Sequence, residues 1–163
     1  LVPYRRNAFT FAPATGVDVA SWPMVYSAAE AWYFKPDAGQ LLGSPANADP
    51  VAAQDVQPEE MDIAIGIDRI QAMPTLSIPR PGRVWAGLRT FSSDGELVGG
   101  FDASAPGFFW LAGQGGYGIQ TSAAMGLTCA CLVRGLPVPP EVALFGVSAQ
   151  RLDPQRFTSN LPK

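Results

Sequence analysis

The feature that most constrains this fold is a glycine loop between a bulky apolar run and a long segment without charge. It lies in residues 107–132, GFFWLAGQGGYGIQTSAAMGLTCACL. Phe108 to Ala112 are typical of a buried strand, and the segment from Gln120 onward predicts a buried helix. A strand, a glycine loop and a helix N-terminus can together hold an anionic or electron-rich group. The loop lets the backbone approach closely, and the helix end supplies N–H groups and partial positive charge.

Three glycines of this loop, Gly113, Gly115 and Gly118, match the G-x-G-x-x-G fingerprint of dinucleotide-binding folds. The full fingerprint requires a second strand that ends in an acidic residue about 20 positions later. Here the helix is followed by residues 135–140, GLPVPP, which lack strand character. Three interpretations remain: a dinucleotide-binding loop, a structural turn without a ligand, and a cofactor-facing loop of another kind. We favour the third.

Composition narrows the class of protein. The 163 residues are 47% hydrophobic and 15% charged, which is typical of a globular chain. A net charge of −3 argues against nucleic-acid binding. Histidine is absent, so this chain contains neither a His-dependent catalytic triad nor a His-based metal site.

Several features bear on the setting of the chain. Cys129 and Cys131 lie two apart on the expected helix and are predicted to be core thiols in a reducing compartment. No apolar run has the length of a membrane span, and no signal peptide is visible. These features favour a cytoplasmic protein. The chain begins at Leu1 and not at Met, which is consistent with a fragment, a processed product or a subunit of a split protein.

The whole chain predicts an α+β fold with mostly antiparallel strands and one βα unit near the end. Pro58 opens a helix to about Ala72, because isoleucines repeat at helical spacing, and Pro74 should end it. Turns are expected at 35–39 and 93–95. A compositional change near 78–83 predicts a division into residues 1–80 and 81–163. The expected strands are 4–12, a pair within 22–34, a short strand from Gln40, 84–91, 96–101 and 108–112.

Two stretches resemble the C-terminal part of the D-amino-acid oxidase/dehydrogenase family of FAD enzymes. They are WAGLRTFSSDGELVGGFD and GFFWLAGQGGYGIQTSAAMG. Within this family, RRNAFTFAP, WYFKPDAGQLLGSPANADP and VQPEEMDIA are most similar to the bacterial D-arginine dehydrogenases. The resemblance extends from about Tyr4 to Phe157. It implies a flavoenzyme fragment: residues 1–80 belong to an antiparallel-sheet substrate domain, and residues 81–163 are the C-terminal part of a Rossmann-like FAD-binding domain. The missing N-terminal half, with the true dinucleotide fingerprint, would belong to the same or a separate chain.

The resemblance also implies a substrate site for a small amino acid. Arg89 matches the family's carboxylate-binding arginine, and a guanidinium can pair with both oxygens at once. Tyr26 stands where the D-arginine dehydrogenases have a small aliphatic residue, which changes the pocket. The implied substrate residues are Arg6, Glu30, Tyr33, Gly87, Arg89 and Gly116.

From the residues alone, plainer interpretations stay open. Arg5 and Arg6 face opposite sides of a strand, and both could be solvated. Tyr33 could be a sheet aromatic, Glu30 a solvated carboxylate, and Arg89 the partner of a structural acid.

The cofactor implied by the resemblance is FAD, held at its ring end. Backbone N–H groups at the helix N-terminus would stabilise the negative charge of reduced flavin. The implied cofactor residues are Gly115, Gly116, Tyr117, Gly118, Ile119, Gln120 and Thr121.

The expected activity is oxidation of D-arginine or another cationic or apolar D-amino acid. Hydride transfer to the flavin gives an imino acid, which is hydrolysed to a 2-oxo acid and ammonia. The alternatives are a glycine- or sarcosine-type amine oxidase of the same family and a non-catalytic remnant of the fold. No metal is expected, and the chain alone is expected to be inactive.

Overall fold

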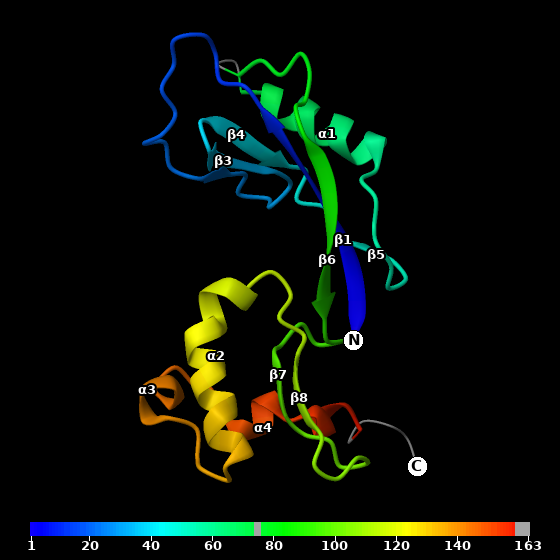
Figure 1. Cartoon of the computed structure of the whole chain (residues 1–163), viewed down its shortest axis with the longest axis vertical. Helices are drawn as coiled ribbons and strands as arrows, with labels where there is room; N and C mark the ends of the chain where they lie inside the picture. The colour runs from blue at the N-terminus through cyan, green and yellow to red at the C-terminus, as the bar shows by residue number, and fades with distance from the viewer. Residues whose placement is uncertain (74–75, 159–163) are drawn as a thin grey trace. The chain divides into compact units, whose positions relative to one another are not determined.

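The computed structural model describes residues 1–73 and 76–158, and it divides into two compact units (Figure 1). Residues Pro3–Leu88 form one, here called the sheet unit. The other, here called the α2 unit, contains the chain from Arg89 onward together with Leu1 and Val2. The mixed fold with antiparallel pairing agrees with the α+β prediction.

The sheet unit is built on strands that meet along β1. Five strands lie in the order β2-β3-β4-β1-β5, and β6 also pairs with β1. Strand β1 is ten residues long and pairs with three other strands, β4, β5 and β6. The strands are β1 (Val2–Phe11), β2 (Val25–Tyr26), β3 (Tyr33–Asp37), β4 (Gln40–Ser44), β5 (Asp49–Pro50) and β6 (Val84–Phe91).

Helix α1 (Glu60–Gln71) covers one face of this sheet (Figure 1). Its isoleucine spacing confirms the amphipathic prediction, since Ile63 and Ile70 are buried; Pro74 lies outside the described residues. Phe9 is fully buried at the centre of the contact. A Cβ on Gly43 would lie 2.9 Å from the Phe9 ring, so strand and helix pack closely only with glycine there. The buried core comprises Phe9, Phe11, Val19, Phe34, Leu41, Ile63, Ile70 and Ile78.

The turn predicted at 35–39 is shorter in the structure. Strand β3 continues to Asp37, and only Ala38 and Gly39 turn, with φ of 48° and 79°. Pro36 pairs with Leu41 of β4, while the register of β2 on β3 ends at Phe34. The missing N–H of Pro36 therefore breaks no bond to β2, which is why proline is tolerated in this strand.

The α2 unit has one long helix against a two-stranded sheet (Figure 1). Its small core consists of Met125, Cys129 and Leu152. The predicted tight turn at residues 93–95 leads from β6 toward β7, with Gly95 at φ 76°. The elements are β7 (Val98–Phe101), β8 (Phe109–Ala112), α2 (Gly118–Val133), α3 (Pro140–Ala143), α4 (Ala149–Leu152) and the 3-10 turn Pro154–Phe157.

Strand β8 and helix α2 form where they were predicted, but they are not buried. Leu111 of β8 is 54% exposed, and of α2 only Met125, Thr128 and Cys129 are buried. The apolar content indicated elements enclosed on all sides. Among the described residues of this unit, β8 pairs with β7 alone, and much of β8 and α2 stays exposed.

The dinucleotide-binding interpretation of the glycine loop is excluded. Strand β8 pairs antiparallel with β7, and α2 is followed, within the described residues, by short helical turns and not by a strand. A Rossmann unit needs a second, parallel strand after the helix. Within the same residues, no helix has both the length and the apolar content to cross a membrane.

Candidate functional site

The glycine loop lies over the last residues of β6, within the α2 unit. The N–H of Gly115 donates to the carbonyl of Thr90 at 2.9 Å. Gly113 and Gly115 have φ of 68° and 53°, a region that side chains rarely adopt. A Cβ on Gly115 would lie 2.5 Å from the Phe91 ring. Loop and strand can therefore approach this closely only because Gly115 has no side chain. Phe91 was not anticipated from the sequence, since nothing local indicates that it supports the loop.

Arg89 meets the next residue of the loop. A Cβ built on Gly116 would lie 3.1 Å from Nη1 of Arg89, so the guanidinium rests against this glycine. Arg89 and Phe91 are two apart in β6 and face the same side of the strand. Arg89 lies against Gly116 and Phe91 lies against Gly115, so the loop runs alongside these two side chains of β6. The side chain of Arg89 is half-buried.

Helix α2 begins two residues after this contact. Tyr117 is its N-cap residue, makes no side-chain cap bond, and is 56% exposed. The N–H groups of Gly118, Ile119 and Gln120 belong to the first turn, where no carbonyl of the same helix lies four residues earlier. Thr121 differs, because its N–H donates to the carbonyl of Tyr117 at 3.0 Å. The first turn contains no acidic residue that would compensate the positive end of the helix.

Arg6 and Tyr33 lie on one face of the sheet unit, the face away from α1. Their neighbours Arg5 and Phe34 point toward α1 and the core, and strand residues alternate. Tyr33 pairs with Ser44, and the register of β1 on β4 places Ala8 opposite Ser44. Arg6 is two residues from Ala8 and therefore lies on the same face. The sequence had predicted this opposition of Arg5 and Arg6.

Arg5 is not solvated, and its partners were not foreseen. Its side chain is 17% exposed, and its guanidinium lies 2.8 Å from Glu59 and 3.5 Å from Asp62. Asn7 donates to Asp62 at 2.7 Å, which fixes β1 on the start of α1. Burial, together with the nearby Asp49 carboxylate, raises the pKa of Asp62 despite Arg5. Arg5 and Asn7 thus anchor the strand that presents Arg6. In sequence these partners lie about 50 residues away, beyond any local signal.

The remaining predicted substrate residues are exposed. Gly87 is in β6, with open space where a Cβ would be. Glu30 lies in the turn before β3 with φ of 52°, and its N–H donates to Ser27 at 2.9 Å. Tyr26 pairs directly with Tyr33 across β2 and β3, so both tyrosines are on the same face.

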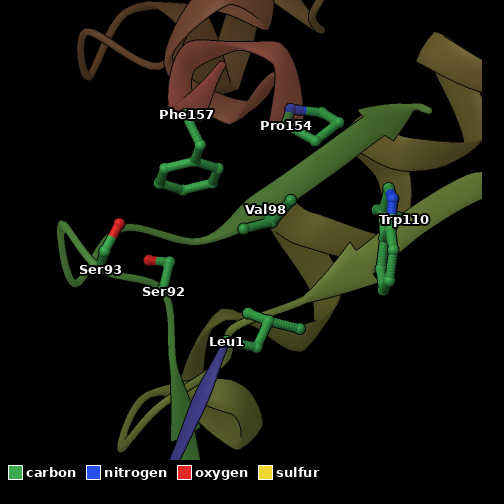
Figure 2. Close-up of a pocket in the computed structure, with 7 residues that line it drawn as sticks. All are labelled: Leu1, Ser92, Ser93, Val98, Trp110, Pro154 and Phe157. Carbon is green, nitrogen blue, oxygen red and sulfur yellow. The ribbon is translucent and has the colours of Figure 1, made fainter. Parts of the chain in front are cut away.

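A cavity of about 340 Å³ in the α2 unit is shown in Figure 2. It lies between the turn at Ser92 and Ser93 and the ring of Phe157, and Trp110 and Leu1 also line it. It includes none of the predicted substrate or cofactor residues. Its chemistry is mainly apolar, without a charged side chain, so we place the candidate site at Arg89 and the glycine loop instead. No cluster of metal-binding side chains is found in residues 1–73 and 76–158.

Comparison with known proteins identifies the family of this chain. The family model for the DAO-type FAD-dependent oxidoreductases matches residues 1–132. The chain belongs to this family. FAD is the cofactor of the family, and the loop between β8 and α2 lies within the matched residues.

Solved structures show the same fold at low sequence identity. Iminodiacetate oxidase from a Chelativorans species matches 94% of this chain with a TM-score of 0.76 and 18% identity. L-Proline dehydrogenase from P. horikoshii matches all of it with a TM-score of 0.72 and 21% identity. Fructosamine oxidase from Aspergillus fumigatus matches 98% with a TM-score of 0.76 and 11% identity. The chain spans only 40%, 42% and 41% of these three structures.

Proposed function

We propose that this chain forms the carboxylate-binding and flavin-ring side of an FAD-dependent enzyme that oxidises D-amino acids. D-Arginine, or another cationic or apolar D-amino acid, is the proposed substrate. The main support is the guanidinium of Arg89 against Gly116, two residues before the open N-terminus of α2. A guanidinium beside the first-turn N–H groups of a helix suits an anionic ligand and an electron-rich ring edge.

Arg89 binds and orients the substrate in this proposal. Its two terminal nitrogens pair with the two carboxylate oxygens, which fixes the rotation of the amino acid as well as its position. Arg6 and Tyr33, which lie on one face of the sheet unit, are the proposed substrate contacts of that unit, a guanidinium and a hydroxyl. Gly87 and Gly116 offer backbone groups without a Cβ, and Glu30 is an exposed carboxylate for a cationic side chain. The chain therefore contributes orientation, which accelerates a reaction by holding the reacting atoms in position.

The start of α2 fits the ring end of FAD. Three first-turn N–H groups, from Gly118, Ile119 and Gln120, are donors suited to an acceptor-rich ring edge. Gly115, Gly116 and Tyr117 precede them, and the N–H of Thr121 is already used within the helix. FAD held there would supply the acceptor for the hydride that leaves the substrate Cα. The imino acid that leaves is then hydrolysed to a 2-oxo acid and ammonia.

Tyr26 supports a second candidate, a glycine- or sarcosine-type amine oxidase. Tyr26 and Tyr33 are cross-strand partners, so two bulky rings occupy neighbouring positions on the proposed substrate face. This leaves less room for a long side chain than a small aliphatic residue at position 26 would. A substrate without a side chain would suit such a face better than D-arginine.

A substrate panel on the complete flavoprotein tests the proposal. D-Arginine, D-lysine, D-methionine, L-arginine, glycine and sarcosine are mixed anaerobically with the protein, and bleaching of the flavin band is followed. We expect fast bleaching with D-amino acids and at least 100-fold slower bleaching with L-arginine. Bleaching confined to glycine and sarcosine would favour the second candidate. No bleaching with any amine would indicate a non-catalytic remnant.

The isolated 163-residue chain should bind little FAD and show no turnover. It contains the proposed ring-end contacts, and the dinucleotide-binding unit that its glycine loop formally matched is not formed. Equilibrium dialysis with FAD, followed by absorption near the flavin band at roughly 450 nm, measures this. Stoichiometric flavin on the isolated chain would contradict the expectation.

We also propose that the protein works in the cytoplasm. Cys129 is buried, Cys131 is half-buried, and both are free thiols. Burial raises the pKa of the Cys129 thiol, which keeps it protonated and unreactive. Free thiols of this kind are typical of a reducing compartment.

A further inference from the structure

Asn7 is a fully buried polar residue next to Arg6, the residue of β1 that the proposed function places in contact with the substrate. Its side chain faces α1 on the same side of the strand as Phe9 and Phe11, which belong to the apolar core. Burying an amide costs free energy unless its polar atoms find hydrogen-bond partners. A buried asparagine at this position therefore needs a reason other than packing.

The main chain of Asn7 is bonded by two side chains. Its N–H donates to Oδ1 of Asn47 at 3.0 Å, and its carbonyl accepts from the hydroxyl of Ser44 at 2.6 Å. Ser44 is the last residue of β4 and is itself fully buried. It is also the cross-strand partner of Tyr33, so the same residue fixes β1 relative to the strand that carries Tyr33.

These bonds lie where β1 changes its ladder partner. The strand pairs with β4 at residues 9–11 and with β5 at residues 4 and 5. Continued by two residues, the register on β4 would place Pro45 opposite Asn7, and proline has no N–H to donate. Arg6 lies in this interval, so on this side of β1 the side-chain bonds to Asn7 take the place of ladder bonds.

The side chain of Asn7 joins β1 to the start of α1. Its Nδ2 donates to Asp62 at 2.7 Å, and its Oδ1 accepts from the N–H of Glu59 at 3.2 Å. Asn47 donates to the same oxygen of Asp62 at 3.1 Å, which closes a ring of hydrogen bonds among Asn7, Asn47 and Asp62. A satisfied polar network of this kind rigidifies a protein interior and favours one geometry over others.

We propose that Asn7 is a positioning residue for Arg6: its hydrogen bonds with Ser44, Asn47 and Asp62 hold β1 where the guanidinium of Arg6 can contact the substrate. This inference rests on the proposed function, which makes Arg6 a substrate contact, and it adds the residue that acts through Arg6. Asn7 acts from the opposite face of the sheet. A guanidinium binds an anionic group through directional hydrogen bonds, so a small shift of β1 weakens the contact. The expected consequence is weaker substrate binding, measured as a higher KM.

The first test exchanges donor and acceptor within the network of the complete flavoprotein. Asn7→Asp puts a second carboxylate against Asp62, and we expect KM for D-arginine to rise at least about 10-fold while kcat changes less than about 3-fold. Adding Asp62→Asn to Asn7→Asp restores a donor–acceptor pair and should return KM to within about 3-fold of the wild-type value. Asp62→Asn alone keeps an acceptor for Asn7 and should change KM little. No recovery in the double variant would overturn the proposal.

A double-mutant cycle with Arg6→Ala separates positioning from a loss of stability. In the Arg6→Ala background, Asn7→Asp should raise KM by less than about 2-fold, because no guanidinium is then left to misplace. Ile70→Val is the control, since Ile70 is buried to the same extent as Asn7. It should lower Tm and leave KM unchanged with or without Arg6. Independent effects of Asn7→Asp and Arg6→Ala on KM would overturn the proposal, as would an unchanged KM in Arg6→Ala alone.

Ser44→Ala replaces Asn7→Asp in the cycle if the latter gives no folded flavoprotein. It removes the 2.6 Å hydrogen bond to the carbonyl of Asn7 without adding charge. Its effect on KM should also disappear in the Arg6→Ala background, and an effect that persists there would contradict the proposal. Glycine replaces D-arginine in these assays if the substrate panel favours the second candidate.

The proposed function and the positioning role fail in different ways. A wild-type flavoprotein that oxidises no amine refutes the proposed function, and the positioning role with it. A wild-type protein that oxidises an amine and loses affinity with Arg6→Ala, but does not respond to Asn7→Asp or Ser44→Ala, refutes the positioning role alone.

Discussion

The two units of this chain bury their apolar residues to very different degrees. In the sheet unit, eight buried hydrophobic residues form one core between the sheet and α1. In the described part of the α2 unit the core cluster has three members, Met125, Cys129 and Leu152, and nine of the 16 residues of α2 are exposed. Both units are rich in apolar residues. The difference therefore lies in what each unit can pack against, and it indicates that the sheet unit is the more self-sufficient of the two.

The difference also separates two kinds of functional residue. Arg6 belongs to a strand that is anchored by a buried core and by the contacts of Arg5 and Asn7 with α1. The guanidinium of Arg89, by contrast, lies against Gly116 of the glycine loop. We expect Arg6 to keep its position in the isolated chain, whereas the position of Arg89 should depend on the conformation of the glycine loop.

The largest expected effect is on the core of the sheet unit. Phe9→Ala should lower the free energy of unfolding by roughly 3–5 kcal/mol, because it removes a fully buried ring from the contact with α1. Met125→Ala, the matched change in the α2 unit, should cost about 2 kcal/mol, because the core cluster around Met125 has few buried members. Urea unfolding followed by fluorescence measures both. Trp110 is the single tryptophan from Arg89 onward and reports on the α2 unit. A larger loss for Met125→Ala would reverse the comparison.

A smaller effect is expected at the glycine loop. Gly115→Ala should cost roughly 1–3 kcal/mol, because the methyl group meets Phe91 and alanine is strained at φ 53°. Gly107→Ala is the control, since its φ of 84° is also positive but its Cβ position is open. The difference between the two variants measures the contact with Phe91. Combining Gly115→Ala with Phe91→Leu should recover part of the loss; no recovery would contradict the contact.

The smallest effect is a pH dependence of opposite sign in the two units. A hydrogen bond from Arg156, opposed by partial burial, lowers the pKa of Asp94 in the α2 unit below its ordinary 3.8. Its ionised form therefore stabilises that unit above pH 3.8, and this stability is lost as the pH falls further. The pKa of Asp62 in the sheet unit is raised, mainly by burial, so ionisation weakens that unit as the pH rises above 3.8.

Urea midpoints between pH 3 and pH 6 measure this contrast. Asp94→Asn should flatten the acid loss reported by Trp110, and Asp62→Asn should remove the decline of the sheet unit toward neutral pH. Parallel pH profiles of the two units, unchanged by either substitution, would show that these carboxylates do not distinguish them.

Local patterns were sufficient for much of the fold. The strand of β6 at residues 84–91, the tight turn at Gly95 and the helix with Ile63 and Ile70 all form where the sequence predicts them. Each depends on neighbours a few residues away. The turn predicted at residues 35–39 was too long. Residues 35–37 form a strand because they pair with β4, and this pairing overrides the turn preference of Pro36.

The site was predictable only as a set of residues. Alternation placed Arg5 and Arg6 on opposite faces, but the acids that lie against Arg5 belong to α1, to the residue before it and to β5. The sequence likewise could not show that Phe91 supports Gly115, because this contact depends on how the loop returns over β6. The exposure of α2 was missed since apolar content indicates that a helix is buried but does not identify the surface that covers it.

The most direct test of the account is Arg89→Lys in the complete flavoprotein, with Arg134→Lys, an exposed arginine after α2, as the control. Lysine keeps the charge but cannot pair with both carboxylate oxygens. We predict a loss of roughly 1.5–3 kcal/mol in kcat/KM for D-amino acids, about 10- to 150-fold, with flavin content unchanged. Kinetics of Arg89→Lys that match those of Arg134→Lys would show that Arg89 does not hold the substrate.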